Sequence, residues 1–296
     1  MLHWTHAGAV ASPTTLQIRV TRRFPGRVQA GAPEPQRSLT DAEVLSNIEH
    51  FTVHRRGPRA IPCQAMVLSG VDLDARPALA DIVDQARHWG VAHTTLHLGH
   101  GDRDRLARSP LGPRVDAVAL TVADVADIAD IAALRARDQP HVTAVVVLDE
   151  RSLPRLEMLA RGLARVGPHR VVFTWPFPPS APPPRARQAA AALASALPLL
   201  DARGVASGVK GLPACALGSI PVDRLWRSQN RWYVDAGHQL DEALLFFPDV
   251  VRFAKTDVCR FCEATDRCDG PPEQWLAEGL AGVLTPMEEP EGRSGG

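Results

Sequence analysis

Residues 65–98 read AMVLSGVDLDARPALADIVDQARHWGVAHTTLHL, and this stretch decides the fold class. Its first four residues are an apolar run typical of a buried strand, and residues 94–98 form a second strand pattern. Between them, residues 78–89 have the apolar spacing of a helix, which Gly90 would end. A helix between two strands returns the chain to the same end of the sheet, so the strands run parallel. The stretch therefore predicts an α/β fold.

The same unit recurs along most of the chain. Residues 16–20 alternate apolar and polar side chains as a strand does, and a helical pattern starts after Ser38 and Thr40. Six such units in series predict parallel strands joined by right-handed crossovers, in an open barrel or a doubly wound sheet. In both architectures the chemistry lies at the carboxyl ends of the strands. The later strand patterns are at 115–122, 142–148 and 170–175, and the later helical patterns are at 125–134, 153–163 and, after proline-rich residues 176–184, up to about residue 202.

Length, composition and charge narrow the class of protein. With 296 residues, 45% of them hydrophobic, the chain can bury one large core or a barrel with an appendage. Its 33 basic and 33 acidic residues balance, which argues against a nucleic-acid partner or an anionic membrane. Residues 1–12 lack a basic segment and an apolar run long enough for a signal peptide or a membrane span. We therefore expect a soluble, cytoplasmic protein.

Four of the five cysteines have the spacing of a metal site. Cys259, Cys262 and Cys268 lie close together, and Cys215 lies upstream in a Leu-Pro-Ala-Cys segment. Two thiolates three residues apart can bind one centre without backbone strain, so the set predicts an iron–sulfur cluster or a four-cysteine zinc site, with free thiols as the remaining alternative. Zinc is the less favoured of these two alternatives, because structural zinc sites usually pair two Cys-x2-Cys loops and this chain has one. Cys63 opens an apolar strand, where we expect it to pack as a small hydrophobic side chain.

Together these features resemble the radical S-adenosylmethionine (radical SAM) enzymes that carry a SPASM or Twitch-type extension. The likeness rests on the six strand–helix units, the apolar second strand that runs into Leu68-Ser69-Gly70, and the cysteine-bearing tail, and it covers residues 15–286. It implies a partial (β/α)6 barrel in residues 1–210 and a metal-binding extension in residues 211–296. It also implies that the four tail cysteines hold one auxiliary 4Fe-4S cluster.

Two motifs of that family are altered in this chain. The family's first strand ends in Arg-Cys-Asn-x-Arg-Cys-x-x-Cys, and here Phe24, Val28 and Gly31 stand where the cysteines belong. Their side chains have no donor atom for iron, so we expect no reductive cleavage of S-adenosylmethionine by this chain acting alone. The family's Gly-Gly-Glu-Pro turn reads Gly-Val-Asp-Leu here, in which Gly70 and the shorter carboxylate of Asp72 would bind S-adenosylmethionine weakly.

Two classes of function follow from this combination. In the first, the chain is an accessory or binding subunit whose barrel binds a peptide, a small molecule or an active partner enzyme, while the cluster is structural or transfers electrons. In the second, it is an enzyme that reuses the barrel, including S-adenosylmethionine-dependent modification without homolytic cleavage. A binding protein stabilised by a four-cysteine zinc site is the third alternative. The sequence names no substrate for any of them.

Histidines and carboxylates around the third strand are a weaker candidate site. His93, His97 and His100 lie on or just after this strand, and Asp102 and Asp104 follow closely. At the mouth of a barrel such residues would form a metal or acid–base cluster. The alternative, which we favour, is ordinary polarity of a surface loop.

Aromatic residues and one further histidine have two interpretations each. Trp175 and Phe177 end the sixth strand, where they would line a substrate pocket or pack at the barrel rim. His238 lies between the tail cysteines and would donate a hydrogen bond to a cluster sulfur or belong to a solvated hairpin. Phe246, Phe247 and Val250 predict a core between barrel and tail.

Overall fold

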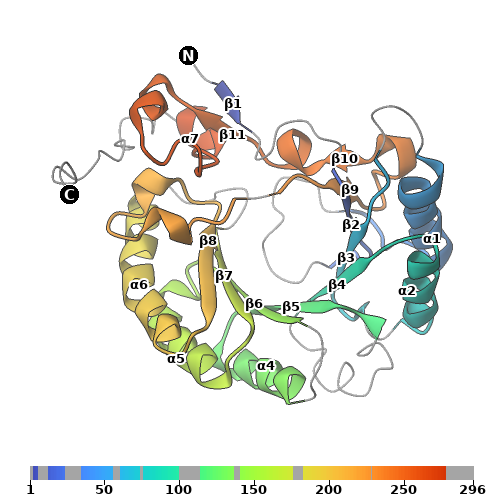
Figure 1. Ribbon diagram of the computed structural model, residues 1–296, viewed down its shortest axis with the longest axis horizontal. Helices are drawn as coiled ribbons and strands as arrows, with labels where there is room; N and C mark the ends of the chain where they lie inside the picture. The colour runs from blue at the N-terminus through green and yellow to red at the C-terminus, as the bar shows by residue number, and fades with distance from the viewer. Residues whose placement is uncertain are drawn as a thin grey trace, which may run out of the picture.

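Parallel strands form the centre of the structure, and they lie side by side in the order in which they occur along the chain (Figure 1). The computed structural model describes residues 3–5, 13–23, 35–55, 61–73, 76–99, 114–136, 141–175, 183–227 and 229–277. Within these ranges the main sheet has the strand order β10-β9-β2-β3-β4-β5-β6-β7-β8. Its consecutive parallel strands are β2 (Thr15–Arg19), β3 (Ala65–Gly70), β4 (His93–Leu98), β5 (Ala117–Val122), β6 (His141–Val147), β7 (Arg170–Thr174) and β8 (Ala206–Lys210).

Two strands from later in the chain extend this sheet beyond β2. β9 (Trp232–Val234) pairs parallel with β2 and places Tyr233 opposite Gln17. β10 (Leu244–Leu245) pairs antiparallel with β9 and forms the outer edge. A separate antiparallel pair joins β1 (His3–Thr5) to β11 (Phe253–Lys255) in the tail. The main sheet has β10 and β8 as its two edges, so in the described residues it is open.

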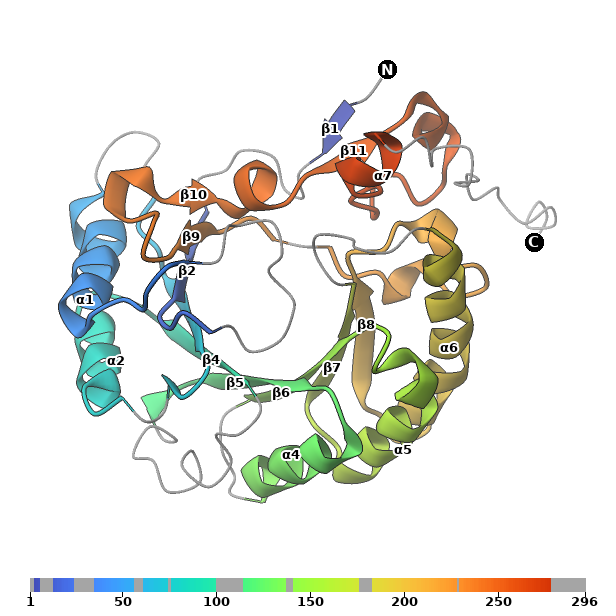
Figure 2. The ribbon, with the colours of Figure 1, turned by 180° about the vertical axis from the view of Figure 1, so that it is seen from behind.

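Helices cover the convex face of the curved sheet (Figures 1 and 2). The first of them begins with a capping box: the backbone N–H of Glu43 donates to Thr40 Oγ1 at 3.2 Å, and the backbone N–H of Thr40 donates to the Glu43 carboxylate at 2.8 Å. Among the described residues, none of the helices combines the length and apolar character needed to cross a membrane. The helices on the convex face are α1 (Asp41–Glu49), α2 (Leu79–His88), α4 (Ile128–Arg135), α5 (Leu156–Val166) and α6 (Pro183–Asp201), whereas α7 (Glu273–Ala277) lies in the tail.

Alternation along the strands gives the sheet two different faces. Ile18 and Leu68 are fully buried and pack in the large core beneath the helices. The next residue of each strand points to the other, concave face. On that face Arg19 lies opposite Ser69, and Ser69 lies opposite His97, so one row of polar side chains crosses three strands.

The predicted α/β fold is confirmed, and strands occur at all six predicted positions. The five helices α1, α2, α4, α5 and α6 all lie on the convex face, which is not the arrangement of a doubly wound sheet (Figure 1). β8 is a further parallel strand that the pattern does not predict. Its sequence, Ala-Ser-Gly-Val-Lys, has only one β-branched residue and a central glycine, both unfavourable for a strand signal.

Candidate metal centre

The four tail cysteines line one cavity. Cys215 lies in a short 3-10 turn after β8, Cys259 lies in a second such turn after β11, and Cys262 ends that turn. Together with Cys268 they surround a cavity of about 30 Å³. A single buried water needs roughly 10–15 Å³, so the space is larger than one water requires. The fold therefore brings together the four cysteines that the sequence singles out.

Consecutive turns arrange the last three cysteines. The backbone N–H of Cys262 donates to the carbonyl of Cys259 at 3.3 Å, and that of Cys268 donates to the carbonyl of Ala264 at 2.9 Å. Ala264 is buried and packs with Ala214, which precedes Cys215. This small apolar contact holds the two cysteine-bearing segments together.

The Cys268 sulfur accepts two backbone hydrogen bonds. Ala214 N–H donates at 3.3 Å and Gly270 N–H donates at 3.2 Å. Gly270 has a φ of 90°, and a Cβ at this position would lie 2.3 Å from the carbonyl oxygen of Ala254, so the approach requires glycine. Two N–H donors stabilise a negatively charged sulfur more than a neutral thiol. Cys268 is therefore placed as a thiolate ligand would be.

Electrostatics at this cavity oppose free thiolates. Burial raises the pKa of Cys215 to about 12, and repulsion from the three neighbouring cysteines adds to the effect. Burial also raises the pKa of Cys268, although its two backbone donors act in the opposite direction. Because each negative charge hinders the next, the set can ionise fully only with a cation at its centre. Clustered thiolates suit iron–sulfur clusters and zinc.

The four cysteines border one cavity but do not meet the usual criteria for a formed metal site. Among the described residues, no group of three or more His, Cys, Asp or Glu side chains forms a ready-made metal-binding set. The shared cavity nevertheless borders all four cysteines. The turns after β8 and β11 place the four cysteines around this cavity.

Cys63 lies apart from this group. It is 2% exposed, belongs to the large core, and has its sulfur 3.7 Å from the carbonyl oxygen of Pro13. Burial raises its pKa to about 12, which keeps the thiol protonated. The predicted role as a small hydrophobic core residue is confirmed.

The turn that resembles an S-adenosylmethionine site follows β3. A Cβ on Gly70 would lie 2.4 Å from the hydroxyl of Thr21, and the backbone N–H of Val71 donates to that hydroxyl at 2.9 Å. Asp72 adopts a left-handed φ of 58°. The turn is thus held against the segment that follows β2. The three residues that replace the family's cysteines lie outside the described residues: Phe24, Val28 and Gly31.

The structure separates two members of the histidine cluster considered above. His97 lies on the concave face near the end of β4, with Nε2 3.2 Å from Thr121 Oγ1. Burial, with repulsion from Arg231, lowers the pKa of His97 to about 4, so its ring is uncharged at neutral pH. His93 is exposed at the start of the same strand, about 13 Å away along an extended backbone. The other members lie outside the described residues: His100, Asp102 and Asp104.

The aromatic residues belong to cores. Trp175 is fully buried, and its ring meets Trp275 of α7 edge to face, which favours packing over a substrate pocket. Phe246 and Phe247 pack in a second core with residues of β9 and β11, so the predicted core between the main sheet and the tail is confirmed. Phe177 lies outside the described residues.

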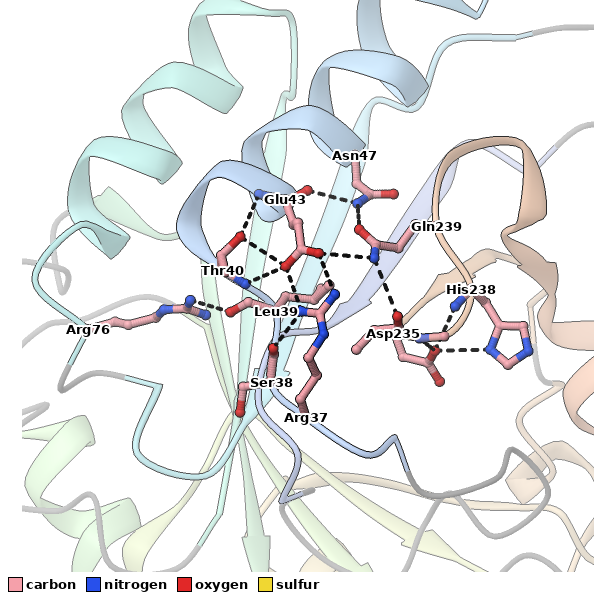
Figure 3. Close-up of polar contacts among 12 residues, drawn as sticks. Arg37, Ser38, Leu39, Thr40, Glu43, Asn47, Arg76, Asp235, His238 and Gln239 are labelled. Atoms are coloured by element: carbon pink, nitrogen blue, oxygen red, sulfur yellow. Dashed lines mark hydrogen bonds and ion pairs between the residues drawn. The ribbon is translucent and has the colours of Figure 1, made fainter.

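His238 packs near α1 and not at the cysteines. Its Nδ1 lies 3.0 Å from the buried carboxylate of Asp235 (Figure 3). The next residue, Gln239, accepts a hydrogen bond from Asn47 of α1 at 3.0 Å, and the backbone N–H of Leu240 donates to Asn47 at 2.9 Å. The prediction that His238 donates to a cluster sulfur is therefore wrong, because the loop after β9 is hydrogen-bonded to the helix beside β2.

The loop after β9 also borders a hollow of about 500 Å³, whose other wall is residues 35–37. The Arg37 guanidinium binds the Glu43 carboxylate, with nitrogen–oxygen distances of 2.6 and 2.8 Å (Figure 3). This pair lowers the pKa of Glu43 well below its usual range. The polar network therefore links the start of α1 to the extension of the sheet.

Comparison with protein-family models gave no match to this chain, and a search of curated proteins gave no significant match.

Proposed function

We propose that this chain is an iron–sulfur protein in which Cys215, Cys259, Cys262 and Cys268 hold one 4Fe-4S cluster. The supporting observation is that these cysteines, from two segments distant in the sequence, line one cavity in which Cys268 already accepts two backbone N–H donors. Four protein thiolates are the full ligand set of one such cluster. A cluster bound there would cross-link the two segments and supply a site for electron transfer.

Zinc is the competing metal. A four-cysteine zinc site uses the same donor atoms and would also cross-link the tail. Its usual arrangement is two Cys-x2-Cys loops, whereas here Cys215 and Cys268 each stand alone. The ligand spacing therefore favours the iron–sulfur cluster.

We further propose that residues 1–210 are a radical SAM-like partial (β/α)6 barrel and that residues 211–296 are a SPASM- or Twitch-like extension. The curved sheet with helices on its convex face supports this architecture, as does the position of Cys215 directly after β8 (Figure 1). The protein would be an accessory or binding subunit in the modification of a peptide or small metabolite, acting with an active partner enzyme. Gly70 and Asp72 are the proposed, weak contacts to S-adenosylmethionine.

An enzyme that reuses the barrel is the second candidate. The observation in its favour is the polar concave face, where Ser69, His97 and Thr121 lie on neighbouring strands. A scaffold that served only as a support would have no need of polar groups at these largely buried positions.

Metal analysis of anaerobically purified protein tests the cluster. We expect about four irons and four sulfides per chain. A content of about eight irons would contradict the absence of a cluster at the altered first loop, and one zinc without sulfide would replace the cluster by a zinc site. Cys63→Ala is the matched control, because this buried thiol is remote from the cavity and its loss should leave the metal content unchanged.

A further inference from the structure

The concave face of the sheet is unusually polar for the interior of a β/α fold. In a closed β/α barrel, branched apolar side chains fill this space in layers. Here the inward positions of β2 and β3 include Gln17, Arg19 and Ser69, all less than 9% exposed, together with the apolar Val67. Ser69 Oγ donates to the carbonyl of Ile18 at 3.2 Å and Arg19 donates to the carbonyl of Arg22 at 2.6 Å, so these groups have partners within the protein. The polar character of the face suits a polar ligand better than an apolar one.

Two cationic side chains, Lys210 and Arg231, lie on the concave face near opposite edges of the main sheet. Lys210 is the last residue of β8 and is half-buried. Arg231 directly precedes β9 and shares the inward orientation of Tyr233, two residues later. Burial lowers the pKa of Lys210 to about 8; repulsion from Arg231 and Arg170 adds to the effect, and attraction to Asp269 opposes it.

The Arg231 guanidinium has little compensation within the described residues. It lies over the ring of Phe246, 3.7 Å from the centroid. Its Nε is buried and has no hydrogen-bond partner there. Burial lowers its pKa to about 10, and the one group that acts in the opposite direction is Tyr233, which is not a carboxylate. An arginine in this state is suited to accept an external anion through its planar fork of N–H groups.

We propose that Lys210 and Arg231, with His97 on the same concave face, form a binding site for the anionic group of a small-molecule ligand, a carboxylate or a phosphate. Arg231 would bind two oxygens of the anion, and Lys210 would neutralise its charge. His97 is electrostatically coupled to Arg231 and hydrogen-bonded to Thr121, so it would border the ligand as an uncharged ring. This inference rests on the proposed function, in which the barrel binds a ligand. It adds the chemical class of that ligand, and it requires no bound metal.

Calorimetric titration of the full chain at low ionic strength tests this site, with inorganic phosphate and succinate as probes. We expect at least one probe to bind, and the tighter one identifies the anion class. Lys210→Met and Arg231→Met should each weaken that binding by about tenfold or more, since each removes a charge at similar side-chain volume. The affinity of Arg231→Lys for the anion should lie between those of wild type and Arg231→Met, because lysine keeps the charge but loses the bidentate geometry.

Arg165→Met is the control, since Arg165 is exposed on the convex side in α5. It should bind the probe as wild type does. Iron content and circular dichroism of each variant separate loss of the anion site from loss of the cluster or of the fold. Binding of neither probe by the wild-type protein, or equal binding by wild type and both methionine variants, would refute the site even if the metal is present as proposed.

Discussion

The indole rings of Trp175 and Trp275 meet edge to face, with their centroids 5.9 Å apart, where the main sheet joins the tail. Trp175 directly follows β7, Trp275 lies in α7, and both are at most 1% exposed. α7 has only five residues and would not form a stable helix in isolation. The tail that carries three of the four cysteines is therefore held to the sheet by tertiary packing.

Replacing Trp275 should loosen this junction. Trp275→Ala removes a fully buried aromatic ring, and we expect a loss of about 3–5 kcal/mol in the free energy of unfolding. Trp275→Phe keeps a ring against Trp175, so its free energy of unfolding should decrease clearly less than that of Trp275→Ala. Urea denaturation followed by circular dichroism measures both variants. Equal stability of the alanine variant and the wild type would show that the tail is held by other contacts.

Removing one cysteine should release the tail without unfolding the sheet. If the cluster joins Cys215 to Cys262 and Cys268, it acts as a cross-link, and metal binding contributes to the stability of this region. Cys262→Ala should therefore abolish cluster absorbance and expose the segment after Cys215 to protease, while the main sheet resists. Cys63→Ala should keep the absorbance. An unchanged spectrum of Cys262→Ala would show that Cys262 is not a ligand.

The sequence predicts the strands well where packing on helices imposes a pattern. Leu96 and Leu98 must face the helices, so β4 is evident from alternation alone. β9 is different, because its three residues pair with β2 across more than two hundred positions of the chain, and short-range periodicity contains no information on such pairing. The same limit explains the error for His238, whose neighbours in space are on α1 although its neighbours in sequence are the cysteines.

The sequence predicts the cysteine site better than it predicts the proposed cation site. The spacing of Cys259, Cys262 and Cys268 is a local signal, and short turns suffice to bring them together. Lys210 and Arg231 give no such signal, since an isolated basic residue in a sequence normally belongs to the surface. Only the fold shows that both are partly buried, on strands β8 and β9 or beside them, at the concave face of the sheet.

Acid should destabilise the protein partly through His97. Its pKa is lowered from 6.5 to about 4 in the folded state, so between these values the unfolded chain binds a proton that the folded chain does not. The stability that this group contributes is complete above pH 6.5 and is lost as the pH falls toward 4, by up to about 3 kcal/mol. His97→Gln keeps a hydrogen-bonding group for Thr121 and should flatten the stability profile in this window.

The difference between His97→Gln and wild type isolates this contribution. His141 and His169 also have lowered pKa values, and they are retained in both proteins. Denaturation free energies at several pH values between 4 and 7 measure the effect. Parallel profiles for the two proteins would show that His97 titrates normally in the folded state.

The altered first loop predicts that this chain does not cleave S-adenosylmethionine reductively. That reaction needs an iron with an open coordination position to chelate the amino and carboxylate groups of the methionine moiety, and a cluster held by four cysteines has none. With Phe24, Val28 and Gly31 in place of cysteines, dithionite-reduced protein should form no 5′-deoxyadenosine above the protein-free rate. Restoring all three cysteines should recover only weak cleavage, because Val71 and Leu73 would still leave the methionine end poorly held. Steady formation of 5′-deoxyadenosine by the unaltered protein would instead assign the reactive cluster to the tail, and one of its four cysteines would then not be a ligand.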